Sequence, residues 1–368
     1  MIIERYIHRE ILQRLIWIAG LLFLIFATNK FVDYLGDAAA GKIPTDFISK
    51  FLWLKMLAIQ TEVLPLVLFL AVILTYSRLH RDNELTILAV AGIGTARQLQ
   101  IVARFSVVFC LLIALISFYA APWAKSNIIK LKEQAWQESI ITGIAAGQFK
   151  ELNKGDSIVY VEELSDDKNT MENVFLQIRQ KDKNNVMRSD MARFNIDKSS
   201  GNRFIIFENG KRYSGTPGML DYQITQYEKY GVLVETGEAA ASTSIPETLP
   251  TSDLLGSDSA LHRAELQWRI SSILACLLLA LLAVLLNQLS LGQKPYTLLF
   301  VSILIYLIYS NLLSISKTLL ERDKISPLLG LWWVHMVLIV MGMIIYYFPV
   351  FMRWRKRDRQ LQVLPAGQ

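Results

Sequence analysis

The sequence predicts an α-helical membrane protein with six transmembrane helices and an exterior antiparallel β domain of the jelly-roll type, inserted between helices three and four. Hydrophobic residues make up 53% of the 368 residues and charged residues only 19%, below the roughly 25% charge of a soluble domain. The hydrophobic residues also cluster in long runs, as membrane spans do. The third observation is a polar stretch, residues 125–262, in which short alternating segments replace those runs.

Six runs approach the ~20 apolar residues that a helix needs to cross a bilayer. They are Ile11–Ala27, Trp53–Tyr76, Val102–Ala121, Ile270–Leu289, Tyr296–Ile315 and Leu328–Phe351. The segments before the first run, between the second and third, and after the sixth are rich in Arg and Lys, so the positive-inside rule places them in the cytoplasm. Both termini are then cytoplasmic. The predicted domains are residues 1–124, the exterior residues 125–262, and residues 263–368.

The net charge of +6 does not indicate nucleic-acid binding, because the basic residues flank the apolar runs. The first run lacks a small-residue cleavage site and is predicted to remain as a span. Cys110 and Cys276 lie inside apolar runs, which indicates packing and not metal or redox chemistry. His335, beside Trp332 and Trp333, is interpreted as a residue of the interfacial aromatic belt.

Motifs of catalytic sites are missing from the sequence. It has no P-loop for phosphate binding, no HExxH zinc motif and no GxSxG nucleophile elbow. We therefore predict no catalytic residue, no metal and no cofactor. Energy for any work that this protein performs is expected to come from a partner.

Beyond Gln148 the pattern changes to short strands separated by turn residues, which is typical of an antiparallel sandwich or jelly roll. The predicted strands are Ser157–Glu162, Val174–Arg179, Ala192–Ile196, Arg203–Glu208, Lys211–Ser214, Tyr222–Tyr227 and Gly231–Val234. Asn209 and Gly210 are predicted to form a type I′ hairpin turn between two of these strands. Arg212 is then either a solvated hairpin charge or a contact to an adjoining domain or a passing lipid.

A short apolar segment, about residues 82–92, lies in the loop between the second and third spans. It is too short to cross a bilayer and too apolar to remain in water, so the sequence predicts a helix that is covered. Asp82 or Asn83 is expected to cap the start of this helix, and Gly92 to end it.

Two interpretations of this segment remain open. It either packs on the protein's own spans or acts as a coupling helix that inserts into a cytoplasmic partner. In the second case Glu84 is the charged contact, and Leu85 and Leu88 are apolar contacts. The spacing of Glu84 and Gly92, eight residues apart, also resembles the loop by which ABC importers hold their ATPase.

Several short motifs follow one another along nearly the whole chain. They are Met1-Ile2-Ile3-x-Arg5-Tyr6, Gly41-Lys42-Ile43-Pro44, Leu64-Pro65-Leu66, Glu84, Ala121-Pro122-Trp123, Gly147-Gln148-Phe149 and Ala264-Glu265-Leu266-x-Trp268-Arg269-Ile270. In this order and spacing they resemble the LptF/LptG family of lipopolysaccharide export permeases, with a closer likeness to its LptF branch.

The resemblance implies a permease subunit of an ABC exporter in the bacterial inner membrane, with the β domain in the periplasm. An LptG-like permease would be its partner, and the pair would extract lipopolysaccharide from the outer leaflet. The other implied partners are a dimer of LptB-like ATPases, an LptC-like bitopic protein and an LptA-like periplasmic bridge. Two alternatives remain: the paralogous LptG subunit, and a membrane-anchored assembly or sensor protein that does not transport.

Lipopolysaccharide carries phosphates above several acyl chains, so its cavity requires apolar walls and a basic rim. Lys30, Lys55 and Lys317 lie at the external ends of predicted spans, where lysine can pair with phosphate or extend toward water. Glu62 precedes Pro65 by three residues, and an ionisable group beside a helix kink commonly faces a cavity or a partner. These four residues are the candidate substrate-binding residues.

Overall fold

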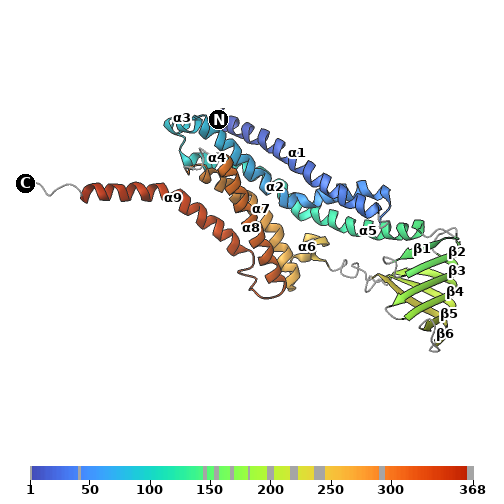
Figure 1. Ribbon diagram of the computed structural model, residues 1–368. Helices are drawn as coiled ribbons and strands as arrows, with labels where there is room; N and C mark the ends of the chain where they lie inside the picture. The colour runs from blue at the N-terminus through green and yellow to red at the C-terminus, as the bar shows by residue number, and fades with distance from the viewer. Residues whose placement is uncertain are drawn as a thin grey trace, which may run out of the picture. The chain divides into compact units, whose positions relative to one another are not determined.

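A computed structural model of the chain describes residues 2–39, 43–143, 147–152, 157–165, 170–180, 183–196, 203–215, 223–235, 245–289 and 295–362 (Figure 1). The chain divides into two compact units. We call Met1–Asn29, Leu54–Lys125 and Leu249–Gln368 the helical unit, and Lys30–Trp53 with Ser126–Thr248 the sheet unit.

The helices lie on both sides of the sheet in sequence. Before it come α1 (Ile2–Ala39), η1 (Thr45–Phe47), α2 (Ile48–Arg81), α3 (Glu84–Val90), α4 (Thr95–Leu115), the π-helix η2 (Ile116–Ala120) and α5 (Ala121–Gly143). After it come η4 (Pro246–Thr248), α6 (Thr251–Leu254), α7 (Ala260–Leu286), α8 (Pro295–Glu321) and α9 (Trp332–Gln362).

The prediction of a helical membrane protein is confirmed. Among the described residues, five helical stretches are long and apolar enough to cross a membrane: Ile2–Ala39, Thr45–Arg81, Thr95–Ala135, Ala260–Leu286 and Tyr296–Glu321. The sixth predicted span lies in α9, which begins at Trp332 and not at Leu328. Its described apolar part, Trp332–Tyr347, is shorter than the other five.

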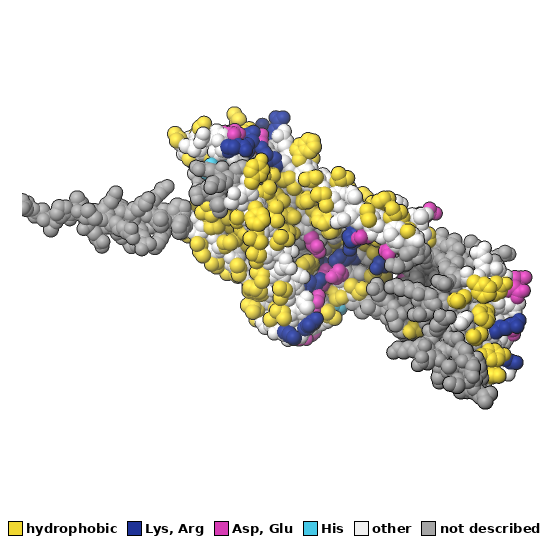
Figure 2. Space-filling model, in the orientation of Figure 1, with side chains coloured by type: hydrophobic (Ala, Val, Ile, Leu, Met, Phe, Trp, Pro, Cys, Tyr) yellow, Lys and Arg dark blue, Asp and Glu magenta, His cyan; other side chains and the backbone are white. Residues whose placement is uncertain are grey.

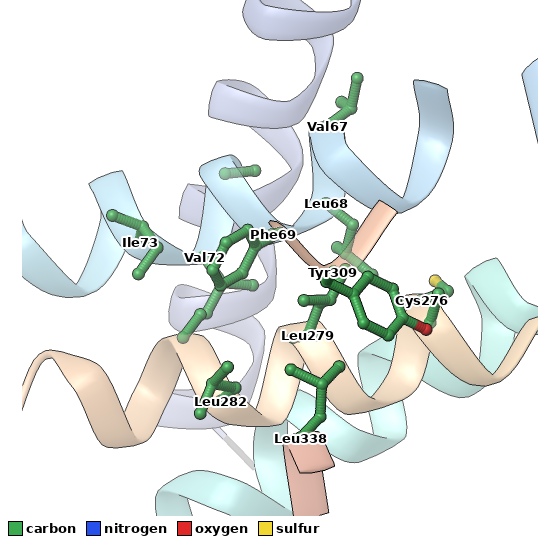
Figure 3. Packing of buried hydrophobic residues seen from close by; sticks show 14 of the residues in the cluster. Val67, Leu68, Phe69, Val72, Ile73, Cys276, Leu279, Leu282, Tyr309 and Leu338 are labelled. Carbon is green, nitrogen blue, oxygen red and sulfur yellow. The ribbon is translucent and has the colours of Figure 1, made fainter. Parts of the chain in front are cut away.

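The core of the helical unit lies around α2 and α7. In each of these helices 61% of the most apolar stretch is buried, against 11% in α1. Figure 3 shows Phe69 and Val72 of α2 gathered with Leu279 of α7, Tyr309 of α8 and Leu338 of α9. The sequence of α7 is apolar nearly all round, which is typical of a helix enclosed by others.

The sheet unit contains one antiparallel sheet whose strands follow the order β1-β2-β3-β4-β5-β6, so each strand pairs with its neighbour in sequence (Figure 1). The strands are β1 (Phe149–Leu152), β2 (Ser157–Leu164), β3 (Thr170–Gln180), β4 (Lys183–Ile196), β5 (Arg203–Gly215) and β6 (Gln223–Glu235). The apolar side chains of the sheet form one cluster, which includes Val161, Leu176 and Phe207. An antiparallel β region between the third and fourth spans is thereby confirmed.

The predicted hairpin turn at Asn209 and Gly210 is wrong. Both residues lie inside β5, which pairs with β4 and β6 on either side of them. Asn209 does adopt a positive φ of 51°, but the strand continues in the same direction. A Cβ atom at Gly210 would lie 2.6 Å from the Arg188 carbonyl oxygen and from the Tyr227 hydroxyl oxygen. The glycine is therefore required by the close approach of neighbouring strands and not by a turn.

The other strands predicted on this stretch also merge. Tyr222–Tyr227 and Gly231–Val234 were expected as separate strands, but Gln223–Glu235 forms the single strand β6. Glycine and asparagine are typical of turns and also of irregular positions inside a strand. Only pairing with both neighbouring strands distinguishes the two cases.

Candidate functional site

The short helix α3 occupies the position predicted for the coupling segment, between α2 and α4. Leu85 and Leu88 pack against the core of the helical unit, whereas Ile87 is 67% and Val90 is 87% exposed. The helix therefore rests on the protein's own spans with one face and leaves the other face open. The sequence did not identify Ile87 and Val90 as the outward residues, because a segment that is apolar all round has no polar stripe to mark its open face.

The expected cap of α3 does not form within the described loop. Asn83 is the N-cap residue, but its φ of 58° is left-handed and its side chain makes no capping hydrogen bond. An N-cap side chain usually acts from an extended conformation. Asp82 lies 3.7 Å from the Arg78 guanidinium instead. At the other end, Gly92 has a φ of 86°, which agrees with its predicted role as the terminator.

Glu84, the expected charged contact to a partner, has partners inside the chain. One of its carboxylate oxygens accepts a hydrogen bond of 2.8 Å from the Tyr6 hydroxyl. The other oxygen lies 3.1 Å from Arg78 Nη2. Arg78 also donates to the Tyr6 hydroxyl oxygen and lies 3.7 Å from Glu10. We call Tyr6, Glu10, Arg78 and Glu84 the α3 cluster.

The surroundings of the α3 cluster combine charge with apolar surface. Figure 2 shows charged side chains at the end of the helical unit that carries the N-terminus and α3, next to a broad hydrophobic surface. Tyr6 and Glu84 are separated by 78 positions in the sequence. Their contact joins the starts of α1 and α3, and neither local pattern nor spacing could have predicted it.

A small, half-open pocket lies between α2, α7 and α8. It is lined by Thr61, Glu62, Pro65, Trp268, Ser271, Ser272, Ala275, Tyr306, Ser310 and Leu313. The Tyr306 hydroxyl donates a hydrogen bond of 2.8 Å to the main-chain oxygen of Glu62. Because Pro65 lacks an N–H group, α2 loses a backbone hydrogen bond at this point. The pocket is lined mainly by apolar surface, with a few hydroxyl groups and the Glu62 side chain at its edge.

Glu265 and Arg269 form a buried ion pair on α7. Each residue is 2% exposed, and Arg269 Nε lies 3.1 Å from one carboxylate oxygen of Glu265. The other oxygen accepts a hydrogen bond of 2.8 Å from Lys317 Nζ on α8. We call these three residues the α7–α8 cluster. Lys317 Nζ also lies 5.1 Å from the ring of Trp268, which lines the pocket.

Arg269 also connects parts of the helical unit that are distant in sequence. Its guanidinium donates to Thr251 Oγ1 at 2.8 Å and to the Leu249 carbonyl oxygen at 2.9 Å. The Thr251 hydroxyl in turn donates to the Phe118 carbonyl oxygen at 2.7 Å. The arginine therefore holds the segment that returns to α7 and, through Thr251, the π-helix η2 that follows α4.

The spacing of Glu265 and Arg269 is a sequence signal for this cluster. Glu265 and Arg269 lie four residues apart at the edge of an apolar run, where opposite charges on one helix face can pair. Charged residues at such a position are costly unless they are paired or functional. Neither residue is predicted as a site residue from this spacing, and the pairing of Glu265 with Lys317 is found only in the structure.

The remaining candidate residues belong to neither cluster. Lys30 belongs to the sheet unit and pairs with Asp33 at 2.7 Å. Lys55 is half-buried on α2. Arg212 on β5 donates to Asn185 Oδ1 at 2.8 Å and to the Tyr230 hydroxyl at 2.7 Å. Its guanidinium is therefore held by neighbouring strands and is not freely solvated.

The interpretation of His335 as an interfacial belt residue is wrong. His335 is buried, with the Tyr309 hydroxyl 2.9 Å from Nδ1 and Ser271 Oγ 3.0 Å from Nε2. Its neighbours Trp332 and Trp333 suggested the membrane surface. However, the position of residue 335 on α9 turns its ring toward α7 and α8, where two hydroxyl groups satisfy both nitrogens.

A bundle of membrane-length helices, a sheet inserted after the third of them and a pocket among α2, α7 and α8 define a multi-pass membrane protein of the permease class. The chain belongs to the lipopolysaccharide export system permease family LptF/LptG, whose model matches residues 5–348. It is accordingly an inner-membrane transport subunit of the lipopolysaccharide export system.

Curated relatives agree with the family assignment. The lipopolysaccharide export system permease protein LptF of Escherichia coli strain K12 is 26% identical over 348 residues, which cover 94% of each chain. The protein of the same name from Shigella flexneri gives the same identity and coverage. The similarity thus extends over both units and is not limited to the apolar runs.

Proposed function

We propose that this permease is the LptF-type subunit, which lifts lipopolysaccharide from the outer leaflet of the inner membrane and passes it to a periplasmic bridge. The name of the E. coli relative and the LptF-like motifs support this choice over the paralogous LptG. An LptG-like permease and an LptC-like bitopic protein complete the membrane complex, and an LptA-like protein is the bridge. The distribution of Arg and Lys supports cytoplasmic termini and a periplasmic sheet.

The open face of α3 is the observation that carries the proposal of an external energy source. Ile87 and Val90 are exposed on a helix of seven residues that is too short to span a membrane. Apolar residues at such a place require a cover. The sequence contains no P-loop of its own. A dimer of LptB-like ATPases is therefore proposed to cover α3 from the cytoplasm.

Substitution on the open face of α3 tests this proposal. Ile87→Asp places a charge where the ATPase would bind, and the exposure of Ile87 means that folding should be unaffected. We expect the ATPase to be lost during purification and lipopolysaccharide release to stop. Ile2→Asp, at an apolar residue that is 86% exposed near the same end of the unit, is the matched control. If the Ile87→Asp complex keeps its ATPase and releases lipopolysaccharide normally, the proposal is contradicted. If the purified wild-type complex contains neither an ATPase nor lipopolysaccharide, the protein is instead an assembly or sensor protein.

Lys317 and the neighbouring pocket, which contains Glu62, are proposed to contact the lipid, with Lys317 at its headgroup phosphate. Glu62 lines the pocket, and Trp268 connects it to Lys317. Because Lys317 is engaged by Glu265, a lipid phosphate must join or replace that carboxylate. Lys30 and Lys55 are proposed as further contacts, and Arg212 as a contact in the sheet.

Photo-crosslinking in the purified complex tests the lipid contacts. Crosslinkers at positions 30 and 317 should capture lipopolysaccharide, whereas a crosslinker at Ile308, an exposed apolar residue of α8, should capture phospholipid. Phospholipid alone at all three positions would show that the lysines do not contact the exported lipid.

A further inference from the structure

The α3 cluster joins three helices through one carboxylate. Glu84 begins α3, Tyr6 lies in the second turn of α1 and Arg78 lies in the last turn of α2. Both oxygens of Glu84 are engaged, one by the Tyr6 hydroxyl and the other by Arg78. Hydrogen bonds to a carboxylate are about twice as strong as neutral ones. The start of α3 is therefore fixed to α1 as well as to the helix that precedes it.

The same end of α1 is its most deeply buried part. All of α1 is described, and its buried residues are Ile7, Ile11 and Leu15. Arg104 of α4 adds an ion pair of 2.7 Å to Glu4. From Leu15 onward the helix has no other fully buried residue. Later turns pack on the same core only through partly buried residues such as Ile18, Leu22 and Phe26, so α1 is held most firmly at the end that contacts α3.

We propose that Tyr6 and Arg78 are positioning residues that clamp α3 to α1 through Glu84, so that α3 and the first turns of α1 move as one body. Movement of α3 during the ATP cycle is then carried into the first span. The stretch from Tyr6 to Asn29 is about 35 Å long at ~1.5 Å per residue. A tilt of roughly 5° at its anchored end displaces Asn29 by about 3 Å. This inference rests on the proposed function only in taking the ATPase as the source of the movement.

The clamp gives Glu84 a role that does not require contact with the ATPase. Tyr6→Phe removes one hydroxyl group and leaves the open face of α3, with Ile87 and Val90, unchanged. Binding of the ATPase should therefore persist, while the transfer of movement from α3 to α1 is weakened. A residue with a purely structural role would lower the yield of the complex without changing how much lipid is released per ATP.

The first experiment measures lipopolysaccharide released per ATP hydrolysed in the complete purified complex. Tyr6→Phe is expected to lower this ratio roughly twofold to tenfold, the range for losing one typical hydrogen bond, with normal ATPase content. Tyr296→Phe, at a tyrosine that is 86% exposed, is the matched control and should leave the ratio unchanged. An unchanged ratio in Tyr6→Phe would overturn the proposal.

A double substitution shows whether Tyr6 acts through Glu84. If it does, Tyr6→Phe combined with Glu84→Gln should release no less lipid per ATP than Glu84→Gln alone, because the hydroxyl has already lost its charged acceptor. Independent roles would instead multiply the two losses. Multiplied losses would show that Tyr6 is not a positioning residue for Glu84.

The last experiment detects the clamp without any ATPase. Spin labels at position 90 on α3 and position 12 on α1, both exposed, are introduced after Cys110 and Cys276 are replaced by alanine. We expect one narrow distance distribution in the parent and a broader one in Tyr6→Phe, with Tyr296→Phe like the parent. Equal distributions in all three would overturn the clamp. If the complex lacks an ATPase but the distributions differ, the proposed energy source fails and the clamp stands.

Discussion

The α7–α8 cluster and the α3 cluster each pair an arginine with a glutamate, and the two clusters differ in burial. In the α7–α8 cluster the side chains of Arg269 and Glu265 are 2% and 3% exposed. In the α3 cluster those of Arg78 and Glu84 are 26% and 33% exposed. A buried charge that loses its partner is stranded at a cost of several kcal/mol, whereas an exposed one is re-solvated. The same pair of residue types therefore makes a fixed joint in one place and an exchangeable contact in the other.

The location of each cluster agrees with this difference. Arg269 holds the Leu249 carbonyl and Thr251, so its cluster maintains the return of the chain into α7. The α3 cluster lies beside the open face of α3, where a partner is proposed to dock. A contact that takes part in a transport cycle must be able to change partners, and partial exposure allows this.

Breaking the buried pair should have the largest effect. Arg269→Gln leaves Glu265 in an apolar environment with one cationic partner fewer, and a single-sided loss of a buried pair costs about 3–5 kcal/mol. We expect a corresponding loss of unfolding free energy in detergent and a lower yield of the complex. Arg81→Gln, at a side chain that is 60% exposed, is the control. A loss below about 1 kcal/mol in Arg269→Gln would mean that the cluster is not a fixed joint.

Removing both charges of the buried pair should have an intermediate effect. Arg269→Met together with Glu265→Leu fills the space with apolar atoms and strands neither of the two groups, so the double variant should be more stable than Arg269→Gln by roughly 1–3 kcal/mol. Lys317 then loses its carboxylate partner, so full stability should not return. Denaturant unfolding of both variants measures the difference. A double variant that is less stable than the single one would indicate that the pair is favourable in its own right.

Breaking the partly exposed pair should have the smallest effect on stability. Arg78→Gln is expected to cost less than about 1 kcal/mol, because solvent screens the charges that remain. This loss should disappear in about 1 M salt, where the screening length falls to ~3 Å, while the loss in Arg269→Gln should persist. Unfolding of both variants at low and high salt makes the comparison. The same salt dependence in both would remove the distinction between the clusters.

Local pattern predicted the class and the order of elements for a physical reason. A membrane helix must satisfy its own backbone and cover its length with apolar side chains, so its signature lies in consecutive residues. The runs that became α2, α7 and α8 were identified in this way. The pattern at Asn209 and Gly210 predicted a positive φ that the strand does contain. It did not predict whether the chain reverses there, since that depends on the partners of the strand.

The sequence by itself determined a helical membrane protein with an inserted antiparallel sheet, a short helix after the second span and the apolar character of that helix. Only the tertiary structure decided which of its faces is open and where the charges find partners. Tyr6 contacts Glu84 across 78 positions, and Lys317 contacts Glu265 across 52. Contacts of this kind depend on how the helices pack. The residues next to a glutamate in the sequence are the same whether its side chain meets a lysine of another helix or water. Burial then sets the energy of each pair, so the difference between a fixed joint and an exchangeable contact arises only in the folded chain.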